Sequence, residues 1–233
     1  MEKQYLIHVT SAQEMVYRTL RDQIINMELK PGSVISTQEI ALSLNVSRTP
    51  VREAFLQLQS ENLLEISPQR STVVAKIDIN RVMQERFIRE ALEVECLKRF
   101  IPMADSKTVS KMRENVELQK LAIKEQRYVD YIELDNKFHS IGYEIASETL
   151  CCSIVKKMNG HYDRMRLVST WEGPLVENAI YEHSKMVDYI EQKDVISCEK
   201  LLRTHLQGLD VHSKRLMKNW SDCFTEKSLK QLE

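Results

Sequence analysis

The sequence predicts a mainly α-helical protein in two parts: a small N-terminal part that ends in a β-hairpin, and an all-α C-terminal bundle. Apolar residues recur with helical spacing through most of the chain. Two short, mostly apolar runs, 63–66 and 72–77, flank the turn 67–71 and are typical of paired strands. From Asp78 onward no strand-like alternation occurs, and the whole chain contains only five glycines.

Three helices are expected before the hairpin. Ser11 can cap the first, which runs to about Met27. The second covers residues 37–44, and Asn45 can take the left-handed conformation that ends such a helix. Ser47 can cap the third helix. The apolar face of this third helix consists of Val51, Ala54, Phe55 and Leu58.

The second and third helices are spaced as in a helix-turn-helix. Val46 would fill the turn, and Pro50 is tolerated in the first turn of the third helix, where a missing N–H costs nothing. In this motif the start of the second helix meets base edges in the major groove, where an arginine fork matches guanine. An ordinary helix hairpin with surface arginines is the alternative. The candidate DNA-binding residues are Ser47, Arg48, Thr49 and Arg52.

The hairpin is interpreted as a wing, which makes the N-terminal part a winged helix-turn-helix. Arg70 at its tip could enter the minor groove or touch a phosphate, and a solvated tip is an equally good interpretation. Residues 1–76 contain eight Lys/Arg and eight Asp/Glu, so this part shows no basic signature of nucleic-acid binding as a whole. Only the local cluster of Arg48, Arg52 and Arg70 supports that function.

The remainder of the chain is expected to form an antiparallel bundle of six helices. Asp78, Ser106 and Asp194 are plausible helix caps, and Pro102 marks a break. The polar tail 220–233 is expected to be a short helix or disordered. The six expected helices cover residues 79–100, 106–124, 128–146, 149–170, 175–191 and 195–219.

Composition limits the class of protein. A length of 233 residues allows one or two domains, and an apolar fraction of 42% supports a sizeable core. The net charge of −1 is ordinary, and the five cysteines form no pair with the spacing of a zinc site. Without a signal-peptide pattern or an apolar run of about 18 residues, the sequence predicts a cytoplasmic protein with reduced cysteines and no membrane span.

Asp135 and His139 lie four residues apart in an expected helix, so both side chains point to the same side. A carboxylate and an imidazole together form half of a site for a divalent transition metal. His183 and His205 lie in two later helices beside apolar residues and are expected near the core. These four side chains could converge on one ion. Alternatively, each histidine is an ordinary core or surface residue.

Two stretches of the N-terminal part, 20–32 and 47–53, resemble the winged-helix domain of the GntR family of bacterial transcription regulators. The resemblance covers about residues 11–77. It places Arg48, Thr49 and Arg52 on positions that contact DNA in the family. Gln38 falls where relatives often carry arginine, and glutamine can still read adenine.

The C-terminal part is similar to the FCD ligand-binding domain of the FadR subfamily, over about residues 80–215. The similarity rests on Arg89–Glu93, Asp135 with His139, Glu182–His183 and Arg203–His205. It implies that the four matching positions, Asp135, His139, His183 and His205, hold a divalent transition metal, with zinc, nickel or manganese as candidates.

The same resemblance implies that Arg89 faces the ligand pocket and helps to bind an acidic effector, because a guanidinium beside a metal captures a carboxylate well. A solvated i, i+4 pair with Glu93 is the alternative. Arg164 and Arg166 are weaker candidates for the same role. The histidines without a matching role, expected at the surface, are His8, His161 and His212.

Together these features predict a DNA-binding domain at 1–77 and a domain for metal binding, effector binding and dimerisation at 78–233. The expected protein is a homodimeric transcription regulator, not an enzyme. It binds a palindromic double-stranded operator under the control of a small organic acid at the metal. A metal-sensing regulator is one alternative. A metalloenzyme fused to a DNA-binding domain is another, although the sequence shows no general-base partner or nucleophile motif.

Overall fold

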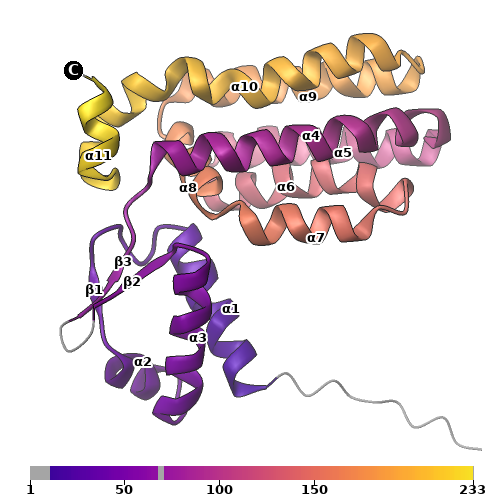
Figure 1. Cartoon of the computed structure of the whole chain (residues 1–233). Coiled ribbons are helices and arrows are strands. Elements are labelled where there is room, and N and C mark those ends of the chain that lie inside the picture. The colour runs from indigo at the N-terminus through magenta and orange to yellow at the C-terminus, as the bar shows by residue number, and fades with distance from the viewer. Residues whose placement is uncertain (1–10, 68–70, 233) are drawn as a thin grey trace, which may run out of the picture. The chain divides into compact units, whose positions relative to one another are not determined.

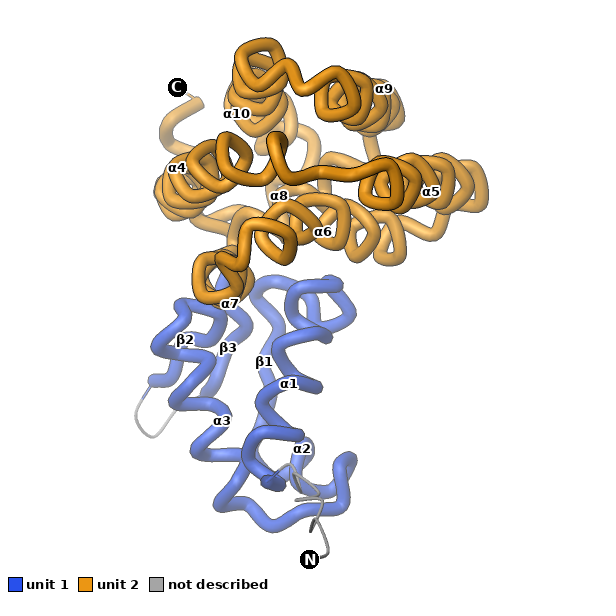
Figure 2. Tube along the Cα trace, turned by 90° about the vertical axis from the view of Figure 1, so that its right-hand side faces the viewer, with its two compact units in different colours: residues 1–76 blue, residues 77–233 orange. Residues whose placement is uncertain are grey.

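The computed structural model describes residues 11–67 and 71–232. The chain divides into two compact units, Met1–Lys76 and Ile77–Glu233 (Figure 2). The first contains helices and a small sheet, and the second is helical except for one isolated β-bridge. The predicted fold class is therefore confirmed.

The first unit is built on three helices, α1 (Ala12–Ile25), α2 (Thr37–Ser43) and α3 (Arg48–Ser60). Asn45 follows the end of α2 in the left-handed conformation, with a φ of 53°, as the sequence predicts. Ser47 occupies the N-cap of α3, but its side chain makes no capping hydrogen bond. The core of the unit includes Leu20, Ile24, Val51, Phe55 and Leu58.

The sheet of this unit has three antiparallel strands in the order β1–β3–β2. The two predicted strands of the wing correspond to β2 (Leu64–Ile66) and β3 (Thr72–Val74). The third strand, β1 (Val34–Ile35), was not predicted, because two residues are too few to show a period. Arg70, predicted at the wing tip, lies outside the described residues.

The second unit is an antiparallel bundle. In Figures 1 and 2, α9 and α10 lie side by side over α4 and α5, and α6 and α7 lie beneath these. No helix in the described ranges is long and apolar enough to cross a lipid bilayer. The main helices are α4 (Ile79–Met103), α5 (Ser106–Lys124), α6 (Tyr128–Ile145), α7 (Thr149–Met158), α8 (Gly160–Thr170), α9 (Gly173–Glu191) and α10 (Val195–Asn219).

The structure corrects three predicted helix boundaries. The single helix expected over 149–170 is two helices, since Asn159 ends α7 and starts α8. Asp105, not Ser106, caps α5, and its Oδ1 accepts from the Thr108 backbone N–H at 2.8 Å. Pro102 lies inside the last turn of α4, so the chain breaks only after Met103. The predicted caps of α4 and α10 are correct.

The helix α8 is buried along its whole length, although half of its side chains are polar. A buried helix shows no amphipathic period, so sequence patterning could not separate it from α7. His161, expected at the surface, is only 2% exposed. The chain continues after α10 into a short helix, α11 (Glu226–Leu229), flanked by the 3-10 turns Ser221–Cys223 and Lys230–Leu232.

Candidate functional site

Four side chains predicted as metal ligands converge in the centre of the bundle. Asp135 and His139 come from α6, His183 from α9 and His205 from α10. One ligand atom of each lies within 4.8 Å of the corresponding atoms of the other three. The structure thus brings together residues that are separated by up to 70 positions in the sequence.

The ligand atoms surround a common point. His183 Nε2 lies 3.2 Å from His205 Nε2 and 3.6 Å from Asp135 Oδ1. His139 Nε2 lies 3.7 Å from Asp135 Oδ2. Aspartate oxygen and imidazole nitrogen are the ligand types that zinc, nickel and manganese sites use. The set therefore has the right chemistry and spacing to enclose one cation.

Each of the three imidazoles is oriented from behind by a second residue. His139 Nδ1 donates to Glu93 Oε2, His183 Nδ1 to Gln119 Oε1 and His205 Nδ1 to Glu182 Oε2, each at 2.8 Å. The Gln119 amide is itself fixed, because its Nε2 donates to Asn115 Oδ1 at 2.8 Å. Metal-bound histidines are held in this way by carboxylates and amides.

These contacts determine the tautomer of each ring. An Nδ1 that donates to an oxygen leaves Nε2 with a free lone pair in the neutral imidazole. The lone pairs of His183 and His205 face one another at 3.2 Å, which is repulsive unless a cation lies between them. His139 Nε2 is buried and has no hydrogen-bond partner among the described residues. The vacant lone pairs fit a metal ion.

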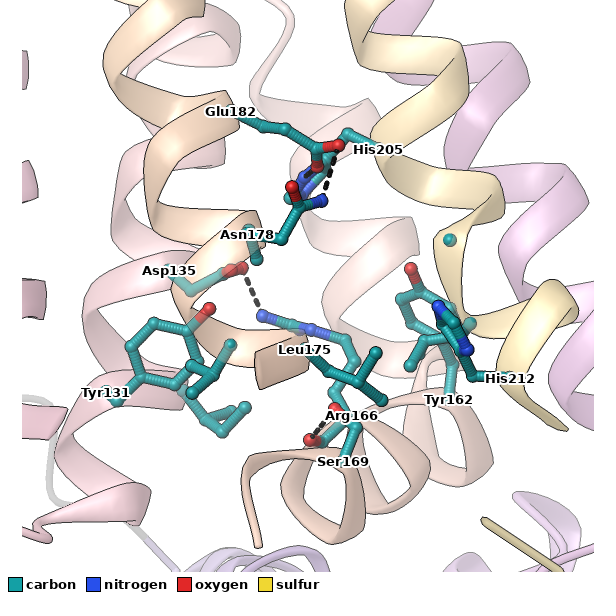
Figure 3. A pocket seen from close by; sticks show the side chains of 15 residues that line it. Tyr131, Asp135, Tyr162, Arg166, Ser169, Leu175, Asn178, Glu182, His205 and His212 are labelled. Carbon is teal, nitrogen blue, oxygen red and sulfur yellow. Dashed lines mark hydrogen bonds and ion pairs between the residues drawn. The ribbon is translucent and has the colours of Figure 1, made fainter. Parts of the chain in front are cut away.

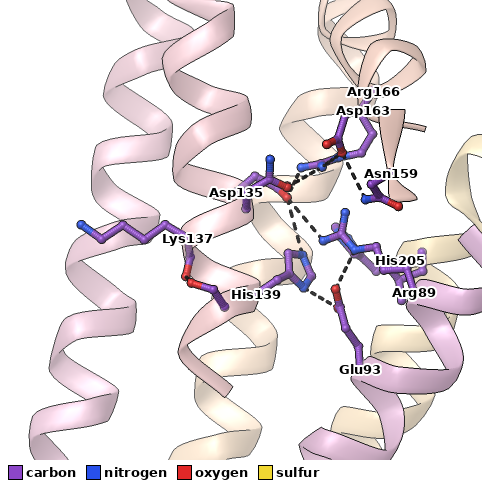
Figure 4. A network of polar contacts seen from close by, with 12 residues as sticks. Arg89, Glu93, Asp135, Lys137, His139, Asn159, Asp163, Arg166 and His205 are labelled. Carbon is purple, nitrogen blue, oxygen red and sulfur yellow. Dashed lines mark hydrogen bonds and ion pairs between the residues drawn. The ribbon is translucent and has the colours of Figure 1, made fainter. Parts of the chain in front are cut away.

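The charges around the cluster also fit a cation. Asp135, Glu93 and Asp163 contact two guanidiniums, Arg89 and Arg166 (Figure 4), whereas Glu182 contacts the imidazole of His205. The three buried carboxylates exceed the two guanidiniums by one negative charge, and the half-buried Glu182 adds a second, in a region where unbalanced charge is costly. A divalent cation would neutralise this surplus.

The pKa shifts in the cluster have clear causes. Burial would raise the pKa of Glu93, but Arg89 and His139 outweigh it and lower that pKa to about 2. Burial would raise the pKa of Asp135, but the charge of Arg166 holds it below its usual range. Burial is the largest cause of the lowered pKa of His139 and of His183. The carboxylates are therefore ionised and these two imidazoles neutral, as metal ligation requires.

A cavity of about 90 Å³ lies against the cluster. Asp135 and His205 form part of its wall, and Arg166 extends into it and contacts Asp135 Oδ2 (Figure 3). An engineered cavity of about 150 Å³ holds benzene, so this one suits a ligand of few atoms. Its apolar wall contains Ile132, Leu175, Val176, Ala179 and Leu209.

The two arginines near Asp135 differ in their access to this cavity. Arg166 lines it, whereas Arg89 lies behind Asp135, outside the residues of the wall. Arg89 Nε donates to Glu93 Oε1 at 2.6 Å, so the i, i+4 pair exists but is buried, not solvated. Its Nη1 has no hydrogen-bond partner among the described residues. The effector-binding role of Arg89 stays a prediction.

Sequence reasoning missed several residues of the site. Gln119 orients His183, and Glu182 orients His205. Glu182 directly precedes His183 in the sequence, which is the one local signal, whereas Gln119 lies on a different helix and gives none. His212, expected at the surface, is half-buried and lines the cavity. His8 lies outside the described residues. Arg164 is fully buried but faces away, toward the Gly160 carbonyl and His161.

A second candidate site is the exposed start of α3. Arg48, Thr49 and Arg52 are all exposed there, and Gln38 is exposed on α2. Neither arginine makes a hydrogen bond or ion pair with another described residue. An unpaired guanidinium at the start of α3, the second helix of the helix-turn-helix motif, is free to reach base edges.

A winged helix with exposed arginines at the start of α3, in a chain that continues into a helical bundle, is the architecture of a DNA-binding transcription regulator. Residues 12–74 match the family model described as bacterial regulatory proteins, gntR family, and residues 86–208 match the FCD domain. The chain belongs to the GntR family of DNA-binding transcription regulators, with an FCD domain of the FadR-like type.

Similar proteins agree with this assignment. The chain is 30% identical to the HTH-type transcriptional repressor RspR of Escherichia coli, over 91% of this chain and 93% of that protein. It is 29% identical to an uncharacterized HTH-type transcriptional regulator of Streptomyces ambofaciens, over 90% of this chain and 88% of that protein. Both relatives are named as transcriptional regulators.

Solved structures show the same fold. Escherichia coli McbR/YncC superposes with a TM-score of 0.73 at 22% identity, over 90% of this chain and 99% of that chain. A putative GntR regulator from Rhodococcus sp. RHA1 gives a TM-score of 0.71 at 21% identity, over 90% of this chain and 99% of that chain.

Proposed function

We propose that this regulator binds its operator under the control of a small organic acid, which is bound at a divalent metal in the bundle. Asp135, His139, His183 and His205 hold the metal, with zinc, nickel and manganese as candidates. The observation that carries the proposal is the set of three imidazoles whose Nδ1 atoms are occupied, so that their Nε2 lone pairs and a carboxylate face one point.

The effector is a small carboxylate. When bound, the metal supplies positive charge and open coordination positions for a carboxylate oxygen. Arg166, which lines the cavity, supplies a second anchor, because a guanidinium pairs well with a carboxylate. The apolar wall accommodates a short hydrocarbon portion. Arg89 lies outside the cavity and holds Glu93 and Asp135 in position. Its Nη1 has no hydrogen-bond partner among the described residues, and a ligand would reach this atom only after the site rearranges.

The winged helix reads DNA through Arg48, Thr49 and Arg52, with Ser47 and Gln38 at the edges of the contact. Residues 1–76 carry equal numbers of acidic and basic side chains, so one copy offers little electrostatic affinity. A homodimer on a palindromic operator doubles the base contacts. We propose this assembly, with dimerisation through residues 78–233.

The proposal is tested by elemental analysis of the purified chain, followed by operator binding. The operator duplex is selected from a random library by the wild-type protein. We expect about one divalent ion per chain, and an operator affinity that shifts when single carboxylic acids of two to six carbons are added to the metal-loaded protein. Absence of metal after growth in metal-replete medium, with a melting temperature unaffected by chelators, would show that the histidines are core residues.

The same experiment separates two rival functions. In a metal sensor, operator affinity follows free metal concentration reversibly and is unaffected by organic acids. In a metalloenzyme, the metal-loaded protein converts a metabolite without any effect on DNA binding. For the proposed function the acid changes operator affinity only while the metal is present, and His183→Ala removes this response.

A further inference from the structure

The end of the chain returns to the first residues of the second unit. Ile77 N–H donates to the Cys223 carbonyl at 2.8 Å, and Thr225 N–H donates to the Ile77 carbonyl at 3.0 Å, which forms a parallel β-bridge between Ile77 and Phe224. Ser228 Oγ accepts from Ile79 N–H at 2.9 Å. We call residues 223–228 the C-terminal clamp.

The contacts of the clamp are made by buried or half-buried residues, although Glu226 and Lys227 between them are exposed. Phe224, Ser228 and Ile77 are each 0% exposed. Ser228 is held in place by Thr225, whose Oγ1 accepts from the Ser228 backbone N–H at 3.2 Å. A buried hydroxyl that satisfies the first turn of a helix contributes stability, because the N–H groups there have no partner within the helix. The clamp therefore fixes the start of α4.

The backbone N–H of Asp78, between the two residues bound by the clamp, is bound by α8. Asp78 N–H donates to His161 Nδ1 at 3.1 Å. The clamp and α8 thus bind the backbone N–H groups of three successive residues, 77, 78 and 79. Residues 75–76, on the other side, lead directly into the wing of the first unit.

The helix α8 connects this contact to the cavity. His161 is in its first turn, and the same turn is held on α4 by Glu85 Oε2, which accepts from the N–H groups of His161 and Tyr162 at 2.9 Å. Tyr162 and Arg166 on the same helix line the cavity, where Arg166 contacts Asp135. A ligand that competes with Asp135 for Arg166 would exert force on α8. Because α8 is short and buried along its whole length, it cannot shift without displacing the helices packed against it.

The clamp and residues 77–79 lie outside both matched family models, whereas His161 lies inside the FCD match. The gntR match ends at residue 74, and the FCD match covers 86–208. Residues 75–85 and the whole clamp lie outside both.

We propose that the C-terminal clamp, together with His161, is the coupling element that transmits the state of the cavity to the winged helix. It fixes residues 77–79 to the bundle, so that a displacement of α8 moves the start of the connection to the DNA-binding unit. Without the clamp, residues 77–79 fray and operator affinity no longer follows the cavity. This inference rests on the proposed function for the source of the displacement.

The test uses the full chain with Ser228→Ala, which removes the acceptor for Ile79 N–H together with the hydroxyl contact to Thr225 within the clamp. Ser213→Ala is the matched control, since that buried hydroxyl donates to a carbonyl within α10. Hydrogen exchange is followed by mass spectrometry in peptides covering 75–80 and in peptides of α6 and α9, with zinc(II) alone as the probe and with chelator. We expect exchange at 77–79 to rise about tenfold in Ser228→Ala, because an unsatisfied donor loses its protection.

The decisive result is the zinc response. In the wild type and in Ser213→Ala, zinc should slow exchange in α6, α9 and 77–79 and change affinity for the selected operator. In Ser228→Ala it should slow exchange in α6 and α9 but leave 77–79 and operator affinity nearly unchanged. Zinc responses at 77–79 and at the operator that equal those of the wild type would overturn the clamp.

A second pair of variants covers the α8 contact and the case in which zinc does not bind. His161→Leu removes the acceptor for Asp78 N–H, whereas His161→Asn keeps an acceptor atom near the position of Nδ1. If zinc leaves α6 and α9 unprotected in the wild type, the metal proposal fails. The clamp is then judged on metal-free protein, where Ser228→Ala and His161→Leu, but not Ser213→Ala or His161→Asn, should alter operator affinity several-fold. Equal affinity in all five proteins would refute the coupling.

Discussion

The chain places its arginines in two opposite environments. Arg48 and Arg52 at the start of α3 are exposed and bind no described residue, whereas Arg89 and Arg166 in the bundle are buried and paired with carboxylates. A buried charge needs its partner inside the protein, while an exposed one stays free for an external partner. Burial and pairing, not residue type, therefore separate the proposed DNA-reading surface from the proposed metal and effector site.

This comparison predicts that each region can be disabled without the other. Arg52→Ala should give the largest effect on DNA binding. Loss of a bidentate base contact costs about 1–3 kcal/mol, and a dimer on a palindrome loses it twice. Gel-shift affinity for the selected operator should fall by a factor of about 30 or more. Arg18→Ala, an exposed arginine of α1 paired with Glu14, is the control. Affinity within twofold of wild type would remove Arg52 from the interface.

The converse variant is His183→Ala, in the fully buried half of the comparison. It should abolish stoichiometric metal binding and lower stability, because an ion bound only by the folded state contributes about 4 kcal/mol when its concentration is about 1,000 times Kd. Elemental analysis and melting curves with and without chelator measure both effects. A variant that keeps its metal, or whose melting temperature still falls on chelation as in wild type, contradicts the ligand assignment.

Two buried carboxylates of α4, Glu85 and Glu93, have pKa values shifted in opposite directions, because their partners differ. Burial raises the pKa of Glu85 to about 7, against lowering by the Tyr162 N–H and Arg81, whereas Arg89 and His139 lower that of Glu93. A folded-state pKa above the unfolded value of 4.5 means that the folded state binds more protons between pH 4.5 and 7. Glu85 therefore makes the protein less stable as pH rises through this window.

Glu85→Gln removes this pH dependence while keeping an acceptor oxygen for α8. A shift of this size corresponds to about 3 kcal/mol. The free energy of unfolding of wild type, measured relative to the variant by urea denaturation, should decrease by up to that amount between pH 5 and pH 8. A difference that is constant across this range would show that Glu85 is ionised throughout.

The smallest expected effect comes from a residue that touches no metal. Gln119→Leu leaves the His183 Nδ1–H without its acceptor, and loss of such a contact typically lowers metal affinity about 10- to 100-fold. Competition with a fluorescent chelator measures the affinity. Gln207→Leu is the control, because that amide contacts Glu90 and no histidine. Equal metal affinities of Gln119→Leu and Gln207→Leu would show that Gln119 packs in the core without orienting His183.

Local chemistry made much of this predictable from sequence. Asn45, Ser47 and the spacing of apolar residues indicate the helix-turn-helix, and Asp135 with His139 share a helix face in any helical fold. That His183 and His205 meet this pair depends on how α9 and α10 pack on α6, which the residues themselves do not encode locally. The resemblance to FCD domains, not the spacing, selected them.

The failures have physical reasons as well. The separation of α7 from α8 at Asn159 is hidden because a helix buried on all sides has no polar face. The strand β1 is two residues long and is created by pairing with β3. Arg166 gives no local sign of lining the cavity, and the clamp depends on Phe224 and Ser228 meeting a segment about 150 residues earlier. Long-range contacts of this kind require the structure.

The central claim is that the four converging side chains hold one divalent metal. X-ray diffraction from crystals of the wild-type chain, recorded on both sides of the zinc, nickel and manganese absorption edges, tests it most directly. We expect a single anomalous peak within bonding distance of Asp135, His139, His183 and His205, and the absorption edge at which it appears identifies the metal. No anomalous peak among these residues, with the His183 and His205 Nε2 atoms still in contact, would contradict it.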